Sequence, residues 1–180
     1  IVTSIRAINS LPNLLSASRF LMSLPMAWSI FERQWDLCAA VFVLAVTTDL
    51  LDGYAARRLK TTSALGGLLD HSADATFVII TMGCFAWAGA ISVVLPMLTA
   101  LAFFQYTLDS NAHHGRFLVA SRLGRYNGIG YFLFSGALVL SKLLDPNHQF
   151  WSPLIRVTEV LLVLTTTLSM ADRLRRSLNH

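Results

Sequence analysis

Apolar stretches separated by short polar breaks run along the whole chain, and their lengths predict membrane-spanning helices. Each stretch is mostly apolar and about 20 residues long, the length that an α-helix needs to cross the hydrocarbon core of a bilayer. We place the six stretches at about 11–31, 36–57, 66–88, 91–109, 126–144 and 151–171. The pattern therefore predicts an all-α integral membrane protein with six transmembrane helices.

The polar breaks are short and contain residues that end helices. Gly89 and Ala90 leave room only for a tight turn between the third and fourth spans, and a proline lies in the break at 145–147. Residues 1–10 are predicted to form a short interfacial segment. No break is long enough for a separate soluble domain, so we expect residues 1–180 to form a single domain.

Lysine and arginine are distributed unevenly between the two sets of breaks. With an even number of spans both termini lie on one side of the membrane, and that side collects ten basic residues against two on the other. The ten are Arg6, Arg57, Arg58, Lys60, Arg116, Arg122, Arg125, Arg173, Arg175 and Arg176, and the two are Arg33 and Lys142. Because cytoplasmic loops carry an excess of Lys and Arg, both termini are predicted to be cytoplasmic.

Composition agrees with this pattern and narrows the class of protein. Hydrophobic residues make up 54% of the 180-residue chain and charged residues 13%, whereas an ordinary soluble domain is about 25% charged. The net charge is +4, but the basic residues are spread between apolar segments, so no nucleic-acid partner is expected. Any chemistry must therefore be carried out by the helices themselves.

Aspartate is concentrated in one 26-residue window, residues 49–74. Asp49 and Asp52 lie three positions apart near the end of the second span. Asp70 and Asp74 lie four positions apart near the start of the third span. The members of each pair share one face of their helix, and the short connection between the spans brings both pairs to the same cytoplasmic end. Four carboxylates are thus predicted to converge.

Converging carboxylates need a positive partner, because they repel one another and lose hydration. Ligand sets made only of oxygen favour hard cations such as Mg²⁺, Mn²⁺ or Ca²⁺. A cluster of this size has room for two ions, and paired divalent ions suit phosphoryl transfer. The small residues Gly53, Ala56 and Gly66 leave space for a ligand beside the cluster. Arg57 offers a planar fork for phosphate.

Residues 49–74, DLLDGYAARRLKTTSALGGLLDHSAD, resemble the signature of the class I CDP-alcohol phosphotransferase family. They match D-x2-D-G-x2-A-R-x8-G-x3-D-x3-D at all eight fixed positions. In the first span, Pro12, Asn13 and Arg19 resemble the Pro-Asn opening and following Arg of many members. The six predicted spans are similar to the six-helix catalytic domain of the family, so the resemblance covers essentially the whole chain.

The resemblance implies a phospholipid-synthesis enzyme that moves a phosphatidyl group from a CDP-linked lipid, usually CDP-diacylglycerol, to an alcohol with release of CMP. It implies two divalent ions, Mg²⁺ or Mn²⁺, bound by Asp49, Asp52, Asp70 and Asp74. Asp74 is implied to be the general base as well. The residues implied for nucleotide and donor binding are Asn13, Asp49, Gly53, Ala56, Arg57, Thr61 and Gly66. A homodimer is also implied, with its active site expected at the cytoplasmic face of a bacterial inner membrane.

The polar stretch after the fourth span is where we expect the acceptor to bind. Arg116, Arg122 and Arg125 offer guanidinium forks for an acceptor phosphate, which predicts glycerol 3-phosphate or another phosphorylated polyol. The same arginines also fit a role as topology charges. Residues 124–127 depart from the Gly-Lys-x-Lys-Thr stretch of phosphatidylglycerophosphate synthases, because Asn127 replaces the second basic residue. A non-phosphorylated alcohol (inositol, serine or choline) therefore remains open.

A function of another class, ion or proton transport, is also open. Charges inside spans are costly and mark functional sites by default, and Arg19, Arg156 and Glu159 lie inside spans together with the aspartates. Against transport, the aspartates gather at one end of two neighbouring helices, and the chain has no repeated half.

Overall fold

The computed structural model describes residues 11–59, 64–109, 122–146 and 150–178. This part of the chain forms six helices and no strand, which confirms the all-α prediction. The helices are α2 (Leu11–Phe31), α3 (Trp35–Leu59), α4 (Ala64–Trp87), α5 (Val94–Asp109), α6 (Arg122–Leu144) and α7 (Ser152–Leu178). Each of the six predicted spans therefore coincides with one helix.

The turns explain where the helices end. Gly89 has a φ of 75° between α4 and α5, a left-handed conformation that glycine adopts at no steric cost. α6 begins at Arg122 rather than at 126, and α7 continues to Leu178 rather than ending at 171. Both helices continue as polar turns beyond their apolar stretches. Helical backbone hydrogen bonds form in polar residues as well as in apolar ones.

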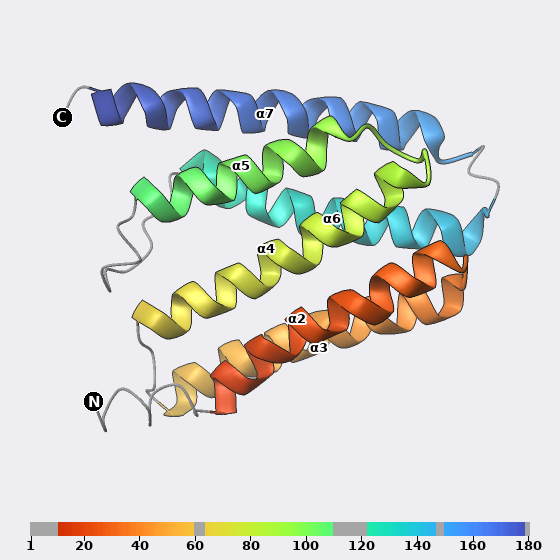
Figure 1. Ribbon diagram of the computed structural model, residues 1–180, viewed down its shortest axis with the longest axis horizontal. Helices are drawn as coiled ribbons and strands as arrows, with labels where there is room; N and C mark the ends of the chain where they lie inside the picture. The colour runs from red at the N-terminus through yellow and green to blue at the C-terminus, as the bar shows by residue number, and fades with distance from the viewer. Residues whose placement is uncertain (1–10, 60–63, 110–121, 147–149, 179–180) are drawn as a thin grey trace.

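Successive helices run back and forth between the two ends of the bundle (Figure 1). α2, α4 and α6 begin at the end where α3, α5 and α7 finish, at the left of the figure. α2 packs against both α3 and α4, while α6 packs against α3, α4 and α7. α5 packs against α4 and α7. This arrangement places the first turns of α4 and the last turns of α3 beside the first half of α2.

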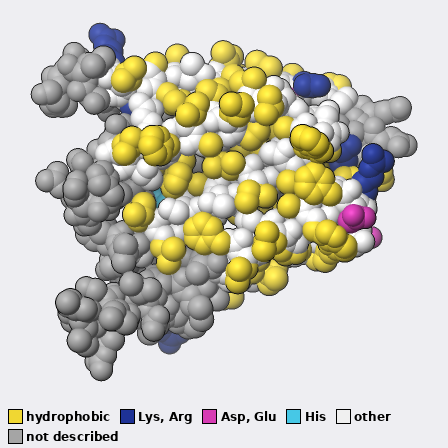
Figure 2. Space-filling view, in the orientation of Figure 1, with side chains coloured by type: hydrophobic (Ala, Val, Ile, Leu, Met, Phe, Trp, Pro, Cys, Tyr) yellow, Lys and Arg dark blue, Asp and Glu magenta, His cyan; other side chains and the backbone are white. Residues whose placement is uncertain are grey.

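The outer surface of the bundle is apolar. Leu133, Phe104 and Leu168 are each more than 60% exposed. Figure 2 shows hydrophobic side chains over the middle of one face and charged side chains toward the ends. Three helical stretches of the described residues are long and apolar enough to cross a membrane: Gly66–Trp87, Leu123–Leu144 and Ser152–Arg175. These features indicate a membrane protein, and six spans with cytoplasmic termini stay a prediction.

All six helices contribute to the buried core. Its members include Met26, Cys38, Phe77, Leu95, Phe134 and Ile155. Two glycines on α6 allow close helix packing. A Cβ placed on Gly130 would lie 2.9 Å from Leu162 on α7, and one on Gly136 would lie 2.9 Å from the ring of Phe42 on α3. Because glycine has no side chain at these two positions, α6 lies close to α7 and α3. α6 in turn forms one wall of the site described next.

Candidate active site and metal centre

Three of the four predicted aspartates meet near one end of the bundle. Asp49 lies in the second half of α3, and Asp70 and Asp74 lie one turn apart on α4. One oxygen from each of these carboxylates lies within 4.8 Å of the others. Asp52 belongs to α3, but its side chain lies outside the described part of the chain. The structure thus brings together carboxylates from two helices, as the spacing predicts.

A buried arginine from a third helix lies within this cluster. The side chain of Arg19, on α2, is 0% exposed. Its Nη1 donates hydrogen bonds to Asp49 and Asp74. Its Nη2 donates to Asp70. Because a buried charge is stable only when it is paired and hydrogen-bonded, these contacts account for the burial of Arg19 and join α2 to α3 and α4.

The donor set fits a hard divalent cation. The candidate ligands Asp49, Asp70 and Asp74 all offer carboxylate oxygens. Ligand sets made only of oxygen favour Mg²⁺ or Mn²⁺ over softer metals. The carboxylates of Asp49 and Asp74 are close enough to be bridged by one centre, because a single nitrogen of Arg19 bridges them. Three ionised carboxylates carry three negative charges and Arg19 balances one, so two remain. The described part of the cluster therefore keeps a net negative charge, which attracts divalent cations.

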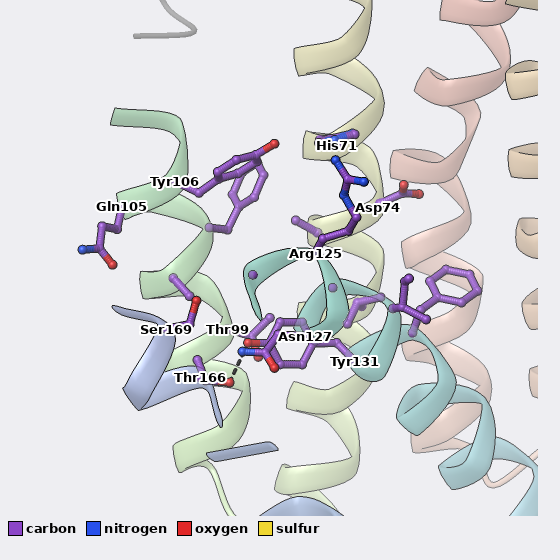
Figure 3. Close-up of a pocket in the computed structure, with 18 of the residues that line it drawn as sticks. His71, Asp74, Thr99, Gln105, Tyr106, Arg125, Asn127, Tyr131, Thr166 and Ser169 are labelled. Carbon is purple, nitrogen blue, oxygen red and sulfur yellow. Dashed lines mark hydrogen bonds between the residues drawn. The ribbon is translucent and has the colours of Figure 1, made fainter. Parts of the chain in front are cut away.

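A cavity of about 540 Å³ opens beside the cluster, between α4, α5, α6 and α7. Its volume is typical of a small-molecule site. Asp49 and Asp74 belong to both the cluster and the cavity wall. In Figure 3, His71 and Tyr106 lie toward one end of the cavity, and Tyr131 lies toward the other. A ligand in this cavity therefore has the carboxylate of Asp74 within its reach.

Two arginines also line the cavity. Arg125 lies in the first turn of α6, and Arg173 lies near the end of α7. The guanidinium carbon of Arg173 lies 4.8 Å from the centre of the Tyr106 ring, within the range of a cation–π interaction. The same ring stacks on His71, with the two centroids 6.2 Å apart. The cavity thus combines carboxylates from α3 and α4 with guanidinium groups from α6 and α7.

The end of the cavity that contains Tyr131 is lined by hydroxyl groups. The Tyr131 hydroxyl lies 2.6 Å from the Thr166 Oγ1, and the Thr166 hydroxyl donates to the carbonyl of Leu162 at 2.5 Å. Tyr131 must therefore donate to Thr166, since the proton of Thr166 is already engaged. Thr99 donates to the carbonyl of Leu95. Each of these hydroxyls uses its proton within the protein, and the oxygens of Tyr131 and Thr99 keep lone pairs at the cavity wall.

Two amide side chains add to this uncharged part of the wall. Asn127 is only 5% exposed and lines the cavity. The Gln105 Nε2 donates to the carbonyl of Met170 at 3.2 Å. The Gln105 Oε1 is buried and has no hydrogen-bond partner within the described part of the chain. An unpaired buried acceptor is costly, so Gln105 is a strained polar group in the contact between α5 and α7.

The remaining predicted site residues are placed less fully. Gly66 lies in the first turn of α4, about one turn before Asp70. Arg125 is exposed and lines the cavity. Thr61 and Arg116 lie outside the described residues. For a further group the position in a helix is described but the side chain is not: Asn13, Gly53, Ala56, Arg57 and Arg122.

Nothing in the local sequence marks the cavity residues of α5 and α7. Arg173 is one of three arginines at the end of the last span and has the pattern of a topology charge. Tyr106 is one of several aromatic and polar residues in the second half of α5. Gln105 is the exception, because a lone amide in an apolar helix is a detectable signal. A charge inside a span marks Arg19 as a functional candidate. Its position in the sequence does not show which residues it contacts.

Arg156 and Glu159, which the transport hypothesis used, lie near the start of α7. Glu159 accepts a hydrogen bond from the backbone N–H of Ser92 at 2.6 Å and lies 3.5 Å from Arg156. These contacts pair the two charges locally and tie α7 to the turn before α5. They lie toward the opposite end of the bundle from the start of α4, where the aspartates gather (Figure 1).

The geometry defines a helical membrane protein with a carboxylate cluster beside a cavity that has both polar and apolar lining residues. Comparison with known proteins specifies the family. The sequence model of the family described as CDP-alcohol phosphatidyltransferase matches residues 9–171. Since this range is most of the chain, the protein belongs to the CDP-alcohol phosphatidyltransferase family.

Several characterised relatives are similar over part of the chain. Cardiolipin synthase (CMP-forming) of Rattus norvegicus is 38% identical over 90 residues, which are 49% of this chain and 30% of that protein. The CDP-diacylglycerol–glycerol-3-phosphate 3-phosphatidyltransferase of Cereibacter sphaeroides is 38% identical over 77 residues, 41% of this chain and 35% of that protein. A cardiolipin synthase/hydrolase fusion protein of Schizosaccharomyces pombe is 30% identical over 161 residues, 78% of this chain and 27% of that protein. The chain thus spans about a third of these relatives.

Proposed function

We propose that this protein transfers a phosphatidyl group from CDP-diacylglycerol to an alcohol and releases CMP, as a step in phospholipid synthesis. The observation that carries the proposal is the cluster of Asp49, Asp70 and Asp74 beside a cavity of about 540 Å³. Membership of the family supports it. The names of two relatives, which include CMP formation and CDP-diacylglycerol, agree with it.

The carboxylate cluster is proposed to hold two divalent ions, Mg²⁺ or Mn²⁺. The ligands are Asp49, Asp70 and Asp74 together with Asp52 of the signature. When bound, the ions neutralise the diphosphate of the donor and stabilise the departing CMP. The donor nucleotide is proposed to bind at the end of the bundle where α2 and α4 begin and α3 finishes. The proposed binding residues are Asn13, Asp49, Gly53, Ala56, Arg57, Thr61 and Gly66.

Asp74 is proposed as the general base. Its carboxylate borders both the acidic cluster and the cavity, so an acceptor hydroxyl in the cavity can reach it. The hydroxyl oxygen forms a bond to the phosphorus of the phosphatidyl group, and the bond from that phosphorus to the CMP oxygen breaks. The hydroxyl proton passes to the Asp74 carboxylate.

The acceptor is proposed to be a phosphorylated polyol such as glycerol 3-phosphate. Arg125 and Arg173 line the cavity and offer forks that suit phosphate. The lone pairs of Tyr131 and Thr99 suit the hydroxyl groups of a polyol. Arg116 and Arg122 are proposed to extend the phosphate site. The name of the relative from Cereibacter sphaeroides includes glycerol 3-phosphate.

The site is proposed to face the cytoplasm, in the inner membrane of a bacterium, and the protein to act as a homodimer. The cytoplasmic orientation rests on the bias of ten basic residues to two between the two sets of breaks. The first turns of α4 and the last turns of α3 lie at the end of the bundle that this bias assigns to the cytoplasm (Figure 1).

The proposal is tested by measuring CMP release from CDP-diacylglycerol by the purified protein with Mg²⁺ or Mn²⁺. The acceptor panel contains glycerol 3-phosphate, inositol phosphate, inositol, serine and choline. Asp74→Asn is expected to abolish release, whereas Asp36→Asn, an exposed aspartate in the first turn of α3, is expected to leave it unchanged.

Each alternative gives a different result. Release with none of the alcohols would contradict the transferase assignment, and release only with an unphosphorylated alcohol would contradict the acceptor assignment. Normal turnover by Asp74→Asn would show that another group is the base. Ion flux into proteoliposomes that needs no CDP-linked donor would favour a transporter.

A further inference from the structure

Arg19 lies at the centre of the carboxylates that a divalent ion would use. Its Nη1 donates to one oxygen of Asp49 and one of Asp74. Asp49 and Asp74 are also two of the three carboxylates that would hold a divalent ion. A guanidinium nitrogen and a metal ion cannot both occupy the space between two carboxylates. An ion held by the same two oxygens would therefore need the position that Nη1 has.

We propose that Arg19 is an exchangeable counter-ion that competes with the divalent cation for these carboxylates. The guanidinium holds Asp49, Asp70 and Asp74 together through its hydrogen bonds. A divalent ion held by Asp49 and Asp74 would displace Nη1 from these two carboxylates. This inference rests on the proposed metal site. It adds Arg19 as a residue that positions the metal ligands and weakens metal binding by competition.

Charge repulsion explains why the cluster needs a cation in both states. Three carboxylate oxygens within 4.8 Å of one another repel strongly when no positive charge is near. Arg19 supplies that charge from α2, a different helix from the two that carry the aspartates. The carboxylates therefore stay converged before the metal arrives.

The shape of the guanidinium makes the exchange feasible. Nη1 contacts Asp49 and Asp74, whereas Nη2 contacts Asp70. Nη1 can leave Asp49 and Asp74 while Nη2 keeps Asp70. A buried guanidinium that keeps one ion pair avoids most of the cost of an uncompensated charge. Lysine has a single charged nitrogen and cannot divide its contacts in this way.

The alternative role of Arg19, as a structural support that stays in place beside the metal, predicts the opposite sign. If Arg19 only arranged the ligands, its removal would weaken metal binding. Competition predicts that removal strengthens it. A third possibility is a general repulsion between two positive charges, which Arg19→Lys tests, because this variant keeps the charge and loses the bridging geometry.

The test measures Mn²⁺ binding to the full chain in detergent, without substrate, by the electron paramagnetic resonance signal of free Mn²⁺. Arg19→Gln is expected to lower the Mn²⁺ dissociation constant about tenfold, which corresponds to ~1.4 kcal/mol. Arg19→Lys is expected to lower it by a smaller factor. Arg156→Gln, at an exposed arginine that pairs with Glu159, is the matched control and is expected to bind as the wild type does.

A thermal unfolding series provides a readout that does not depend on activity. Without metal, Arg19→Gln is expected to unfold at a lower temperature than the wild type, since the carboxylates lose their counter-ion. Mn²⁺ is expected to raise the unfolding temperature of this variant by more than it raises that of the wild type.

The outcomes separate this inference from the proposed function. A dissociation constant for Arg19→Gln that equals or exceeds the wild-type value overturns the competition, even when Asp74→Asn shows that the metal site exists. If the wild type binds no Mn²⁺, or Asp74→Asn binds it equally well, both the metal site and the inference fail. If Arg19→Gln does not fold, Arg19→Lys decides, and binding by that variant equal to or weaker than wild type overturns the competition.

Discussion

Replacement of Arg173 is expected to separate acceptor binding from the chemical step. This arginine lies on α7, lines the cavity and does not belong to the carboxylate cluster. Its guanidinium lies 4.8 Å from the centre of the Tyr106 ring, so its position at the cavity wall is defined by that ring. Arg173→Gln removes the charge and keeps a polar end group.

The expected size of the effect follows from the contact that is lost. A hydrogen bond to a charged group contributes about 1.5–3 kcal/mol, and each 1.4 kcal/mol is about a tenfold change in affinity. The KM for glycerol 3-phosphate should therefore rise roughly 10- to 100-fold, on the same conversion. The kcat should change little. Tyr106→Leu should raise the same KM by about 2- to 10-fold through loss of the cation–π contact, while Tyr106→Phe, which keeps the ring, should not.

The assay is CMP release at saturating CDP-diacylglycerol with glycerol 3-phosphate varied. Arg175→Gln is the matched control, because Arg175 is an exposed arginine two residues further along the same helix. An equal rise in KM for Arg175→Gln would mean that both arginines act only through general surface charge. A loss of kcat at unchanged KM in Arg173→Gln would refute its assignment to acceptor binding.

Two further predictions concern stability and are measured by thermal unfolding in detergent. Gly136→Ala should destabilise the protein by about 1–3 kcal/mol, because the added methyl group overpacks against the ring of Phe42. Gly83→Ala, where no atom lies within 4 Å of the new Cβ, should be neutral or stabilising, and an equal loss there would contradict the packing argument. Glu159→Leu should cost about 1–3 kcal/mol by leaving the backbone N–H of Ser92 without its acceptor. Glu159→Gln, which keeps a carbonyl acceptor, should cost less; if both cost the same, the charge rather than the hydrogen bond is what matters.

Much of the helical layout could be predicted because its determinants are local. The apolar stretch at 11–31 coincides with α2, and Gly89 lies in the predicted tight turn. A bilayer permits only helices or closed barrels across its core, so long apolar segments have few alternatives. The ends of α6 and α7 were less predictable, because polar turns extend a helix without altering its apolar pattern.

The candidate site could be predicted in part for the same reason. The spacing of Asp70 and Asp74 places them on one face of α4, and the short connection to α3 brings Asp49 near them. Arg125 was predicted as a residue for the acceptor, and it lines the cavity. The contributions of Tyr106 and Arg173 were not predicted, because nothing near them in the sequence distinguishes them.

The sequence by itself determined an all-helical membrane protein, its family signature and the convergence of aspartates from two adjacent helices. Only the tertiary structure decided that Arg19 lies among those aspartates, and that α5, α6 and α7 close a cavity beside Asp74. The physical reason is that periodicity along a chain shows which residues share a face of one helix. It does not show which other helix that face meets, and Arg19 reaches partners that are 30, 51 and 55 positions away.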